Sequence, residues 1–107
     1  MSSQEFDYVV VGGGSAGCCV AGRLSEDAGT SICLLEAGGS DDAVLVRAPL
    51  GFALTAPFNI NSWGYNTIPQ AGFKGRKGFQ PRGKVMGGSS SVNAMVYTRG
   101  NAHDYNS

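Results

Sequence analysis

The chain has 107 residues, of which 42% are hydrophobic and 15% charged, and its formal net charge at pH 7 is zero. This composition is typical of a globular protein of one domain and excludes a disordered chain. Zero net charge also argues against a protein that holds nucleic acid mainly by electrostatic attraction, so we expect no nucleic-acid partner.

The charges are unevenly distributed along the chain. Seven of the eight acidic residues lie at or before Asp42, whereas five of the eight basic residues lie within residues 74–84. Most basic runs of this kind are solvated loops, and a phosphate-contacting role for part of this one stays open as a second interpretation.

The chain contains no run of the roughly 20 apolar residues that a membrane-spanning helix needs. Residues 1–7 are polar and slightly acidic, unlike the start of an export signal. We therefore expect a cytoplasmic location and no transmembrane segment here, and membrane association through parts outside this chain stays open.

Three cysteines, Cys18, Cys19 and Cys33, are odd in number, and two of them are adjacent. This pattern matches neither a disulfide framework nor a zinc-type pair. The sequence therefore predicts buried, reduced thiols and no metal site.

The first elements along the chain form a strand, a helix and a second strand. Residues 7–11 predict a buried β-strand, because β-branched residues run without polar alternation until glycines stop them. Ala16, Val20 and Leu24 then recur every four residues, which predicts a helix with one apolar face. Residues 31–36 predict the second strand, and about thirty residues is the length expected of a βαβ unit.

The pattern weakens beyond residue 37. Residues 43–54 predict at most a turn of helix, residues 63–68 a short strand, residues 69–82 a glycine-rich basic loop, and residues 88–95 a helix opened by a serine. Two strong strands cannot fill a doubly wound parallel sheet, whose halves each need three. We therefore expect an α/β, Rossmann-like domain that is incomplete in this chain.

A dinucleotide-binding motif joins the first strand to the helix. Gly12, Gly14 and Gly17 match G-x-G-x-x-G, and Glu36 follows Gly17 by nineteen residues at the end of the second strand. Gly12 permits the tight turn, Gly14 lets a pyrophosphate approach the helix amides, and Gly17 lets the helix pack on the strand. A carboxylate at Glu36 suits ribose hydroxyls and would repel the 2′-phosphate of NADP. The motif leaves FAD and NAD both open.

A second motif, residues 82–100, resembles a signature of the glucose-methanol-choline (GMC) oxidoreductases. Residues 63–70 resemble the W-x-Y-x-T-x-P-Q stretch of the choline dehydrogenase-like branch, and residues 12–38 resemble the nucleotide-binding segment at the start of the family's sequences. The resemblance covers nearly the whole chain in collinear order.

The resemblance implies a glutathione-reductase-type fold, FAD as the cofactor, and oxidation of an alcohol to an aldehyde by hydride transfer to flavin N5. It implies that residues 1–107 are the N-terminal part of the FAD-binding domain, with the substrate domain and the C-terminal catalytic histidine in the rest of the same polypeptide. We therefore expect no catalytic residue in this chain and no activity from it alone. The expected partners are an alcohol substrate and an electron acceptor, either oxygen or a quinone.

The cofactor-binding residues follow from the two motifs and the resemblance together. By the resemblance, residues 82–88 wrap the diphosphate and flavin, residues 93–96 lie along the isoalloxazine ring, and Trp63 is included on the family pattern alone. The full set is Gly12, Gly14, Ser15, Ala16, Gly17, Glu36, Ala37, Trp63, Arg82, Gly83, Lys84, Met86, Gly87, Gly88, Ser89, Asn93, Ala94, Met95 and Val96.

Two further positions bear on the cofactor and the chemistry. Family members that bind flavin covalently have a histidine in the second motif where this chain has Val92, so we expect non-covalent FAD. His103 is the single histidine, and we interpret it as an exposed loop residue. Two rival functions stay open: an FAD-containing relative without net redox chemistry, such as a hydroxynitrile lyase, and a non-catalytic NAD-binding module that leaves the second motif unexplained.

Overall fold

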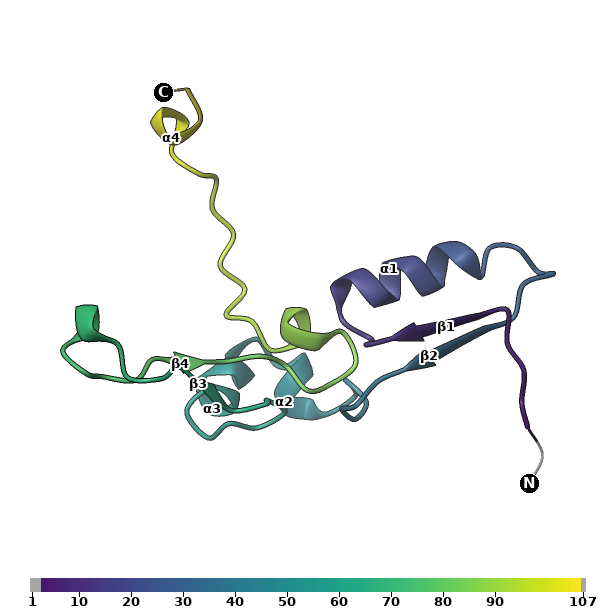
Figure 1. Ribbon diagram of the computed structural model, residues 1–107, viewed down its shortest axis with the longest axis horizontal. Helices are drawn as coiled ribbons and strands as arrows, with labels where there is room; N and C mark the ends of the chain where they lie inside the picture. Colours follow the sequence, from purple (N-terminus) through teal and green to yellow (C-terminus); the bar gives the residue numbers. More distant parts are fainter. Residues whose placement is uncertain (1–2, 107) are drawn as a thin grey trace.

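The computed structural model describes residues 3–106, and its first part is the βαβ unit that the sequence predicts. It consists of β1 (Tyr8–Val11), α1 (Ser15–Leu24) and β2 (Ile32–Leu35). The two strands are parallel, with Tyr8 opposite Ile32 and Val11 opposite Leu35. In Figure 1, α1 lies over one face of this two-stranded sheet.

The prediction that the first strand is buried is wrong for this chain. Val9 is 56% exposed and Val11 is 82% exposed. Parallel sheets bury their strands because helices cover both faces, and here α1 covers one face. Among residues 3–106, Val85 is the single hydrophobic residue of the buried core, and it bridges Gly39 just beyond β2.

Residues 44–55 form three short helical turns in succession. These are α2 (Val44–Arg47), the 3-10 helix η1 (Pro49–Gly51) and α3 (Phe52–Thr55). Pro49 limits the length of α2, since proline disfavours the helical conformation of the residue before it. At Gly51 a Cβ would lie 1.7 Å from the carbonyl oxygen of Leu45, so only glycine lets the chain turn back so tightly.

The predicted loop over residues 69–82 is wrong in part, because it contains a strand. β3 (Tyr65–Asn66) pairs antiparallel with β4 (Phe79–Gln80), and the 3-10 helix η2 (Ala71–Phe73) lies at the tip of this hairpin. A strand of two residues carries no alternating pattern that sequence could reveal. Figure 1 shows the hairpin extending away from the βαβ unit.

The helix predicted over residues 88–95 is also wrong in part. A 3-10 helix, η3, covers only Gly88–Ser91, and Val92 follows it as the C-cap. Gly87 and Gly88 have φ of +85° and +61°, a left-handed conformation that an α-helix does not contain. Beyond η3 the chain extends outward to a short helix, α4 (Ala102–Asn106), that the sequence analysis did not predict (Figure 1).

The molecule is open in shape. Its radius of gyration is 18.1 Å, against about 13 Å for a compact domain of 100 residues. The three cysteines are free, as predicted, but Cys19 is exposed and Cys18 and Cys33 are half-buried, so the prediction of buried thiols is wrong. Within residues 3–106 no helix is long and apolar enough to cross a membrane.

Candidate dinucleotide-binding cleft

A cleft of about 1110 Å³ lies at the carboxyl ends of β1 and β2. Val11 and Leu35, the last residues of the two strands, both line it. Ligands of open α/β sheets bind outside the carboxyl ends of the strands, so the cleft is where such a fold places a nucleotide.

The first glycine segment forms the turn between β1 and α1. Gly12 has φ of +98°, and its N–H donates to the carbonyl oxygen of Leu35 at 2.7 Å. A Cβ on Gly17 would lie 1.8 Å from the carbonyl oxygen of Gly12, so glycine is required for α1 to approach the turn. A Cβ on Gly14 would meet nothing within 4 Å, and Gly14 lines the cleft.

The N-terminus of α1 faces this cleft through Ser15, Ala16 and Gly17. No side chain caps α1 at Gly14, and its first turn contains no acidic residue. The first amides of a helix have no partner within the helix, and the helix dipole makes this end positive. The arrangement suits a bound phosphate group.

The second glycine segment, residues 83–88, lies directly against the first. The N–H of Gly87 donates to the carbonyl oxygen of Gly13 at 2.6 Å, and Gly14 and Gly87 form a parallel bridge. A Cβ on Gly88 would lie 3.0 Å from the Cα of Gly14. Two segments about seventy residues apart in sequence therefore build one wall of the cleft.

The serines after Gly88 mostly support this turn. Ser91 Oγ donates to the carbonyl oxygen of Met86 at 2.7 Å, and Ser90 Oγ donates to that of Gly87. Ser89 Oγ accepts the N–H of Gly83 at 3.1 Å, and Ser89 lines the cleft. All three hydroxyls are thus engaged with the backbone, and of the three serines Ser89 lines the cleft.

Glu36 follows β2, and its carboxylate is half-buried at the edge of the cleft. Its Oε2 accepts the N–H of Gly13 at 2.7 Å, and its Oε1 accepts the N–H of Gly38 at 2.8 Å. A carboxylate oxygen can accept more than one hydrogen bond, so both oxygens keep capacity for a ligand hydroxyl.

Two aromatic side chains and one cationic side chain also line the cleft, and Lys84 lies close to them. The rings of Trp63 and Tyr65 stack with their centroids 6.0 Å apart and their planes at 10°. Lys84 Nζ lies 4.7 Å from the centroid of the Trp63 ring, in a cation–π contact. Arg82 lines the cleft and donates from Nη1 to the carbonyl oxygen of Pro81 at 2.7 Å.

Most of the predicted site residues meet in this cleft. Those that line it are Gly12, Gly14, Ser15, Ala16, Gly17, Glu36, Ala37, Trp63, Arg82, Gly83, Gly88 and Ser89. Met86 and Gly87 contact the first glycine segment without lining the cleft. Lys84 lies on the ring of Trp63 and does not line the cleft either. Val11, Leu35 and Tyr65 also line the cleft and were not predicted from the sequence. Tyr65 follows Trp63 by two residues, a spacing that places side chains on one face of an extended segment and could have indicated it.

The structure does not bring residues 93–96 into the same cleft. Asn93 and Met95 line a pocket of about 230 Å³ beside α2 and α3, and Asn93 and Ala94 line another of about 190 Å³ beside Phe79. Val96 is 80% exposed. Their expected contact with an isoalloxazine ring therefore stays a prediction.

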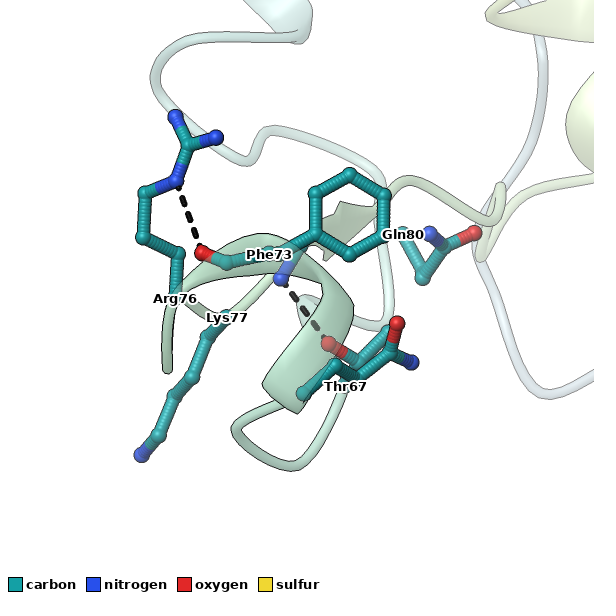
Figure 2. Close-up of a pocket in the computed structure, with 7 residues that line it drawn as sticks. Thr67, Phe73, Arg76, Lys77 and Gln80 are labelled. Atoms are coloured by element: carbon teal, nitrogen blue, oxygen red, sulfur yellow. Dashed lines mark hydrogen bonds between the residues drawn. The ribbon is translucent and has the colours of Figure 1, made fainter.

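Two other features lie apart from the cleft. Figure 2 shows a pocket of about 270 Å³ in the hairpin, where Arg76 Nε donates to the carbonyl oxygen of Phe73 at 3.1 Å. This pocket shares no lining residue with the cleft. His103 is exposed on α4, at the end of the extended segment and away from α1 (Figure 1).

The βαβ unit and its glycine-lined cleft define this chain as part of an α/β dinucleotide-binding protein. Residues 6–107 match the GMC oxidoreductase family. The chain belongs to this family, and the resemblance that its motifs indicate is confirmed.

Curated relatives agree along almost the whole chain. An alcohol dehydrogenase (acceptor) of Pseudomonas putida is 51% identical over 100 residues, which are 94% of this chain and 18% of that protein. An oxygen-dependent choline dehydrogenase of Vibrio vulnificus is 50% identical over 104 residues, 95% of this chain and 18% of that protein. The chain thus spans under a fifth of the length of these relatives.

Solved structures agree with the fold. A pyridoxine 4-oxidase from Mesorbium loti superposes with a TM-score of 0.80 at 40% identity, over 94% of this chain and 20% of that one. A formate oxidase of Aspergillus oryzae superposes with a TM-score of 0.75 at 34% identity, over 87% of this chain and 17% of that one. The chain therefore has the fold of a fragment of the family's Rossmann-like cofactor-binding domain.

Proposed function

We propose that this chain is the N-terminal FAD-binding segment of an enzyme that oxidises an alcohol to an aldehyde. The observation that carries the proposal is the contact between the two glycine segments, with Gly87 bonded to Gly13 beside the carboxylate of Glu36. If the chain bound NAD through the first motif alone, the place of residues 83–88 in the wall of the cleft would have no explanation.

The residues of the cleft fit FAD. The first-turn amides of α1 and the open space beside Gly14 suit the diphosphate, and Glu36 suits the adenosine ribose. Arg82 also lines the cleft and supplies positive charge there. When bound, FAD accepts a hydride from the carbinol carbon, and the residues of this chain hold and orient the cofactor.

The proposed substrate class follows from the relatives, whose names include alcohol dehydrogenase (acceptor), choline dehydrogenase and pyridoxine 4-oxidase. We propose that the substrate is an alcohol and that oxygen or a quinone reoxidises the cofactor. The general base that removes the hydroxyl proton must lie within about 3 Å of the substrate. His103 is exposed on α4, away from the cleft, so we propose that the base and the substrate domain belong to the rest of a longer polypeptide, called the complete enzyme below.

Anaerobic mixing of the complete enzyme with alcohols tests this function. We expect the purified protein to be yellow, and we expect its flavin absorbance to bleach with at least one of choline, pyridoxine or a simple primary alcohol and to return when oxygen or a quinone is added. A matched aldehyde in place of each alcohol is the control. A flavin that no alcohol bleaches would contradict alcohol oxidation, and a colourless protein that binds NAD would contradict the cofactor assignment.

We propose that the flavin is bound without a covalent bond, because family members that bind flavin covalently have a histidine where this chain has Val92. This proposal has its own test. Acid precipitation of the complete enzyme should release the flavin into the supernatant. Colour that stays in the denatured pellet would show that the alignment of the second motif, and with it the place of Val92, is wrong.

A further inference from the structure

The carboxylate of Glu36 holds two separate loops at once. Its Oε2 accepts the N–H of Gly13, in the turn before α1, and its Oε1 accepts the N–H of Gly38, in the segment after β2. At 2.7 and 2.8 Å these are short bonds to a charged acceptor, a class about twice as strong as neutral hydrogen bonds. Glu36 is therefore a structural link before any ligand binds.

Both loops that Glu36 holds are in turn bonded to the second glycine segment. The carbonyl oxygen of Gly13 accepts the N–H of Gly87 at 2.6 Å, and the carbonyl oxygen of Gly39 accepts the N–H of Met86 at 2.8 Å. The contacts are too close for side chains: a Cβ on Gly13 would lie 2.8 Å from Met86 Sδ, and one on Gly38 would lie 2.1 Å from the backbone of Lys84. The carboxylate of Glu36 thus links two backbone segments, and the second glycine segment bonds to both of them.

We propose that Glu36 is a positioning residue that assembles the walls of the cleft, so that nucleotide affinity depends on it even when the ribose hydroxyls are absent. The proposal deepens the proposed function and rests on it for the identity of the ligand. It differs from a ribose contact, because a ribose contact acts only on a ligand that carries the hydroxyls.

The chemistry of the two amides makes the proposal specific. Both groups that face Glu36 are donors, and a carboxylate offers an acceptor to each. Glutamine has the same shape but offers one acceptor and one NH₂ group, which would oppose the remaining N–H. Ribose hydroxyls both donate and accept, so they tolerate glutamine where two backbone amides do not.

The test uses the complete enzyme, freed of flavin, as wild type, Glu36→Gln and the control Glu26→Gln, which makes the same change at an exposed surface ion pair with Arg23. Dissociation constants are measured for ADP and for 2′,3′-dideoxy-ADP. Glu36→Gln should weaken both ligands to a similar degree, by about tenfold or more for the loss of a charge-assisted hydrogen bond. Glu26→Gln should change neither.

Amide hydrogen exchange of the ligand-free proteins supplies a readout that needs no cofactor. Peptides covering residues 12–18, 36–40 and 84–88 should exchange faster in Glu36→Gln than in wild type, with Glu26→Gln unchanged. If Glu36→Gln is insoluble, slow exchange of Gly13 and Gly38 in ligand-free wild type is the expected result, and rapid exchange there overturns the proposal.

The remaining outcomes separate the two proposals. A loss confined to ADP, or unchanged exchange in Glu36→Gln, overturns the positioning role and leaves FAD binding intact. Unchanged affinity for both ligands also overturns it. If wild type binds neither FAD nor ADP, the proposed function fails, and hydrogen exchange alone still decides whether Glu36 organises the three segments.

Discussion

Residues 12–17 and residues 83–88 both bring glycines to the same cleft, but they do so through different backbone structures. The first segment is a regular strand–turn–helix in which Gly12 alone has a positive φ. The second segment has no regular element until η3, and Gly87 and Gly88 are both left-handed. Gly17 serves local helix–strand packing, whereas Gly88 serves a contact with a remote part of the chain.

This difference changes what each glycine contributes. Gly17 is required by the turn five residues before it, since a Cβ there would lie 1.8 Å from Gly12 O. Gly88 is required by Gly14, a residue more than seventy positions away. A Cβ on Gly14 would meet nothing in the protein within 4 Å, and we propose that a bound phosphate uses this open space.

The largest effect is expected at Gly17. Gly17→Ala places a methyl group against a backbone oxygen that cannot move without breaking the turn, so we expect a loss of about 3 kcal/mol or more, the upper end for overpacking. Thermal or denaturant unfolding of the complete enzyme measures it. Gly22→Ala is the matched control, because it lies in the same helix with no atom within 4 Å, and it should be neutral or slightly stabilising. Equal stability of Gly17→Ala and wild type would contradict the packing argument.

A smaller effect, on the ligand and not on the fold, is expected at Gly14. Gly14→Val fits the protein but projects into the cleft between the amides of α1 and the proposed diphosphate, so FAD affinity should fall by at least about tenfold, or ~1.4 kcal/mol. Flavin content and FAD rebinding measure it, with Gly22→Val as the control at an exposed helical site. Full flavin content in Gly14→Val would rule out the first motif as the diphosphate site.

A modest effect is expected for the contact between Lys84 and Trp63. A double-mutant cycle with Lys84→Met and Trp63→Leu should give a coupling energy of about 0.5–1 kcal/mol in the unfolding free energy, the range for an exposed cation–π pair. Lys77, in the hairpin pocket away from Trp63, provides the control cycle, whose coupling should be near zero. Equal coupling in the two cycles would show that Lys84 does not act through the ring.

The smallest effect is expected at Asp7, before β1. The hydroxyl and backbone N–H of Ser31, both donating to Asp7 Oδ2, lower the pKa of this carboxyl below its ordinary value. A lowered folded-state pKa means that the contribution is present above the unfolded pKa of about 4 and is lost as pH falls through the folded pKa. Asp7→Asn should therefore flatten part of the acid-side decline in the free energy of unfolding, measured by denaturant unfolding across this pH range. Identical profiles for Asp7→Asn and wild type would contradict this contribution.

The sequence by itself determined the βαβ unit, because each of its features is local. Strand and helix periods appear within a few residues. They show in the apolar run before Gly12, in the spacing of four residues between Ala16, Val20 and Leu24, and in the second apolar run before Glu36. The same local features identified the family and most of the cleft residues. They predicted a ligand-binding carboxylate at Glu36 but not its bonds to Gly13 and Gly38, which join the segments that follow β1 and β2.

The tertiary structure decided the elements after β2, because contacts between residues far apart in the sequence shape them. Residues 88–95 form only the short 3-10 helix η3, because Gly87 bonds to Gly13 and the following serines bond to the backbone. β4 exists because β3 pairs with it, and not through any pattern of its own two residues. β1 is largely exposed because the burial of a parallel strand depends on helices that cover both faces of the sheet, and an apolar run alone does not supply the second layer.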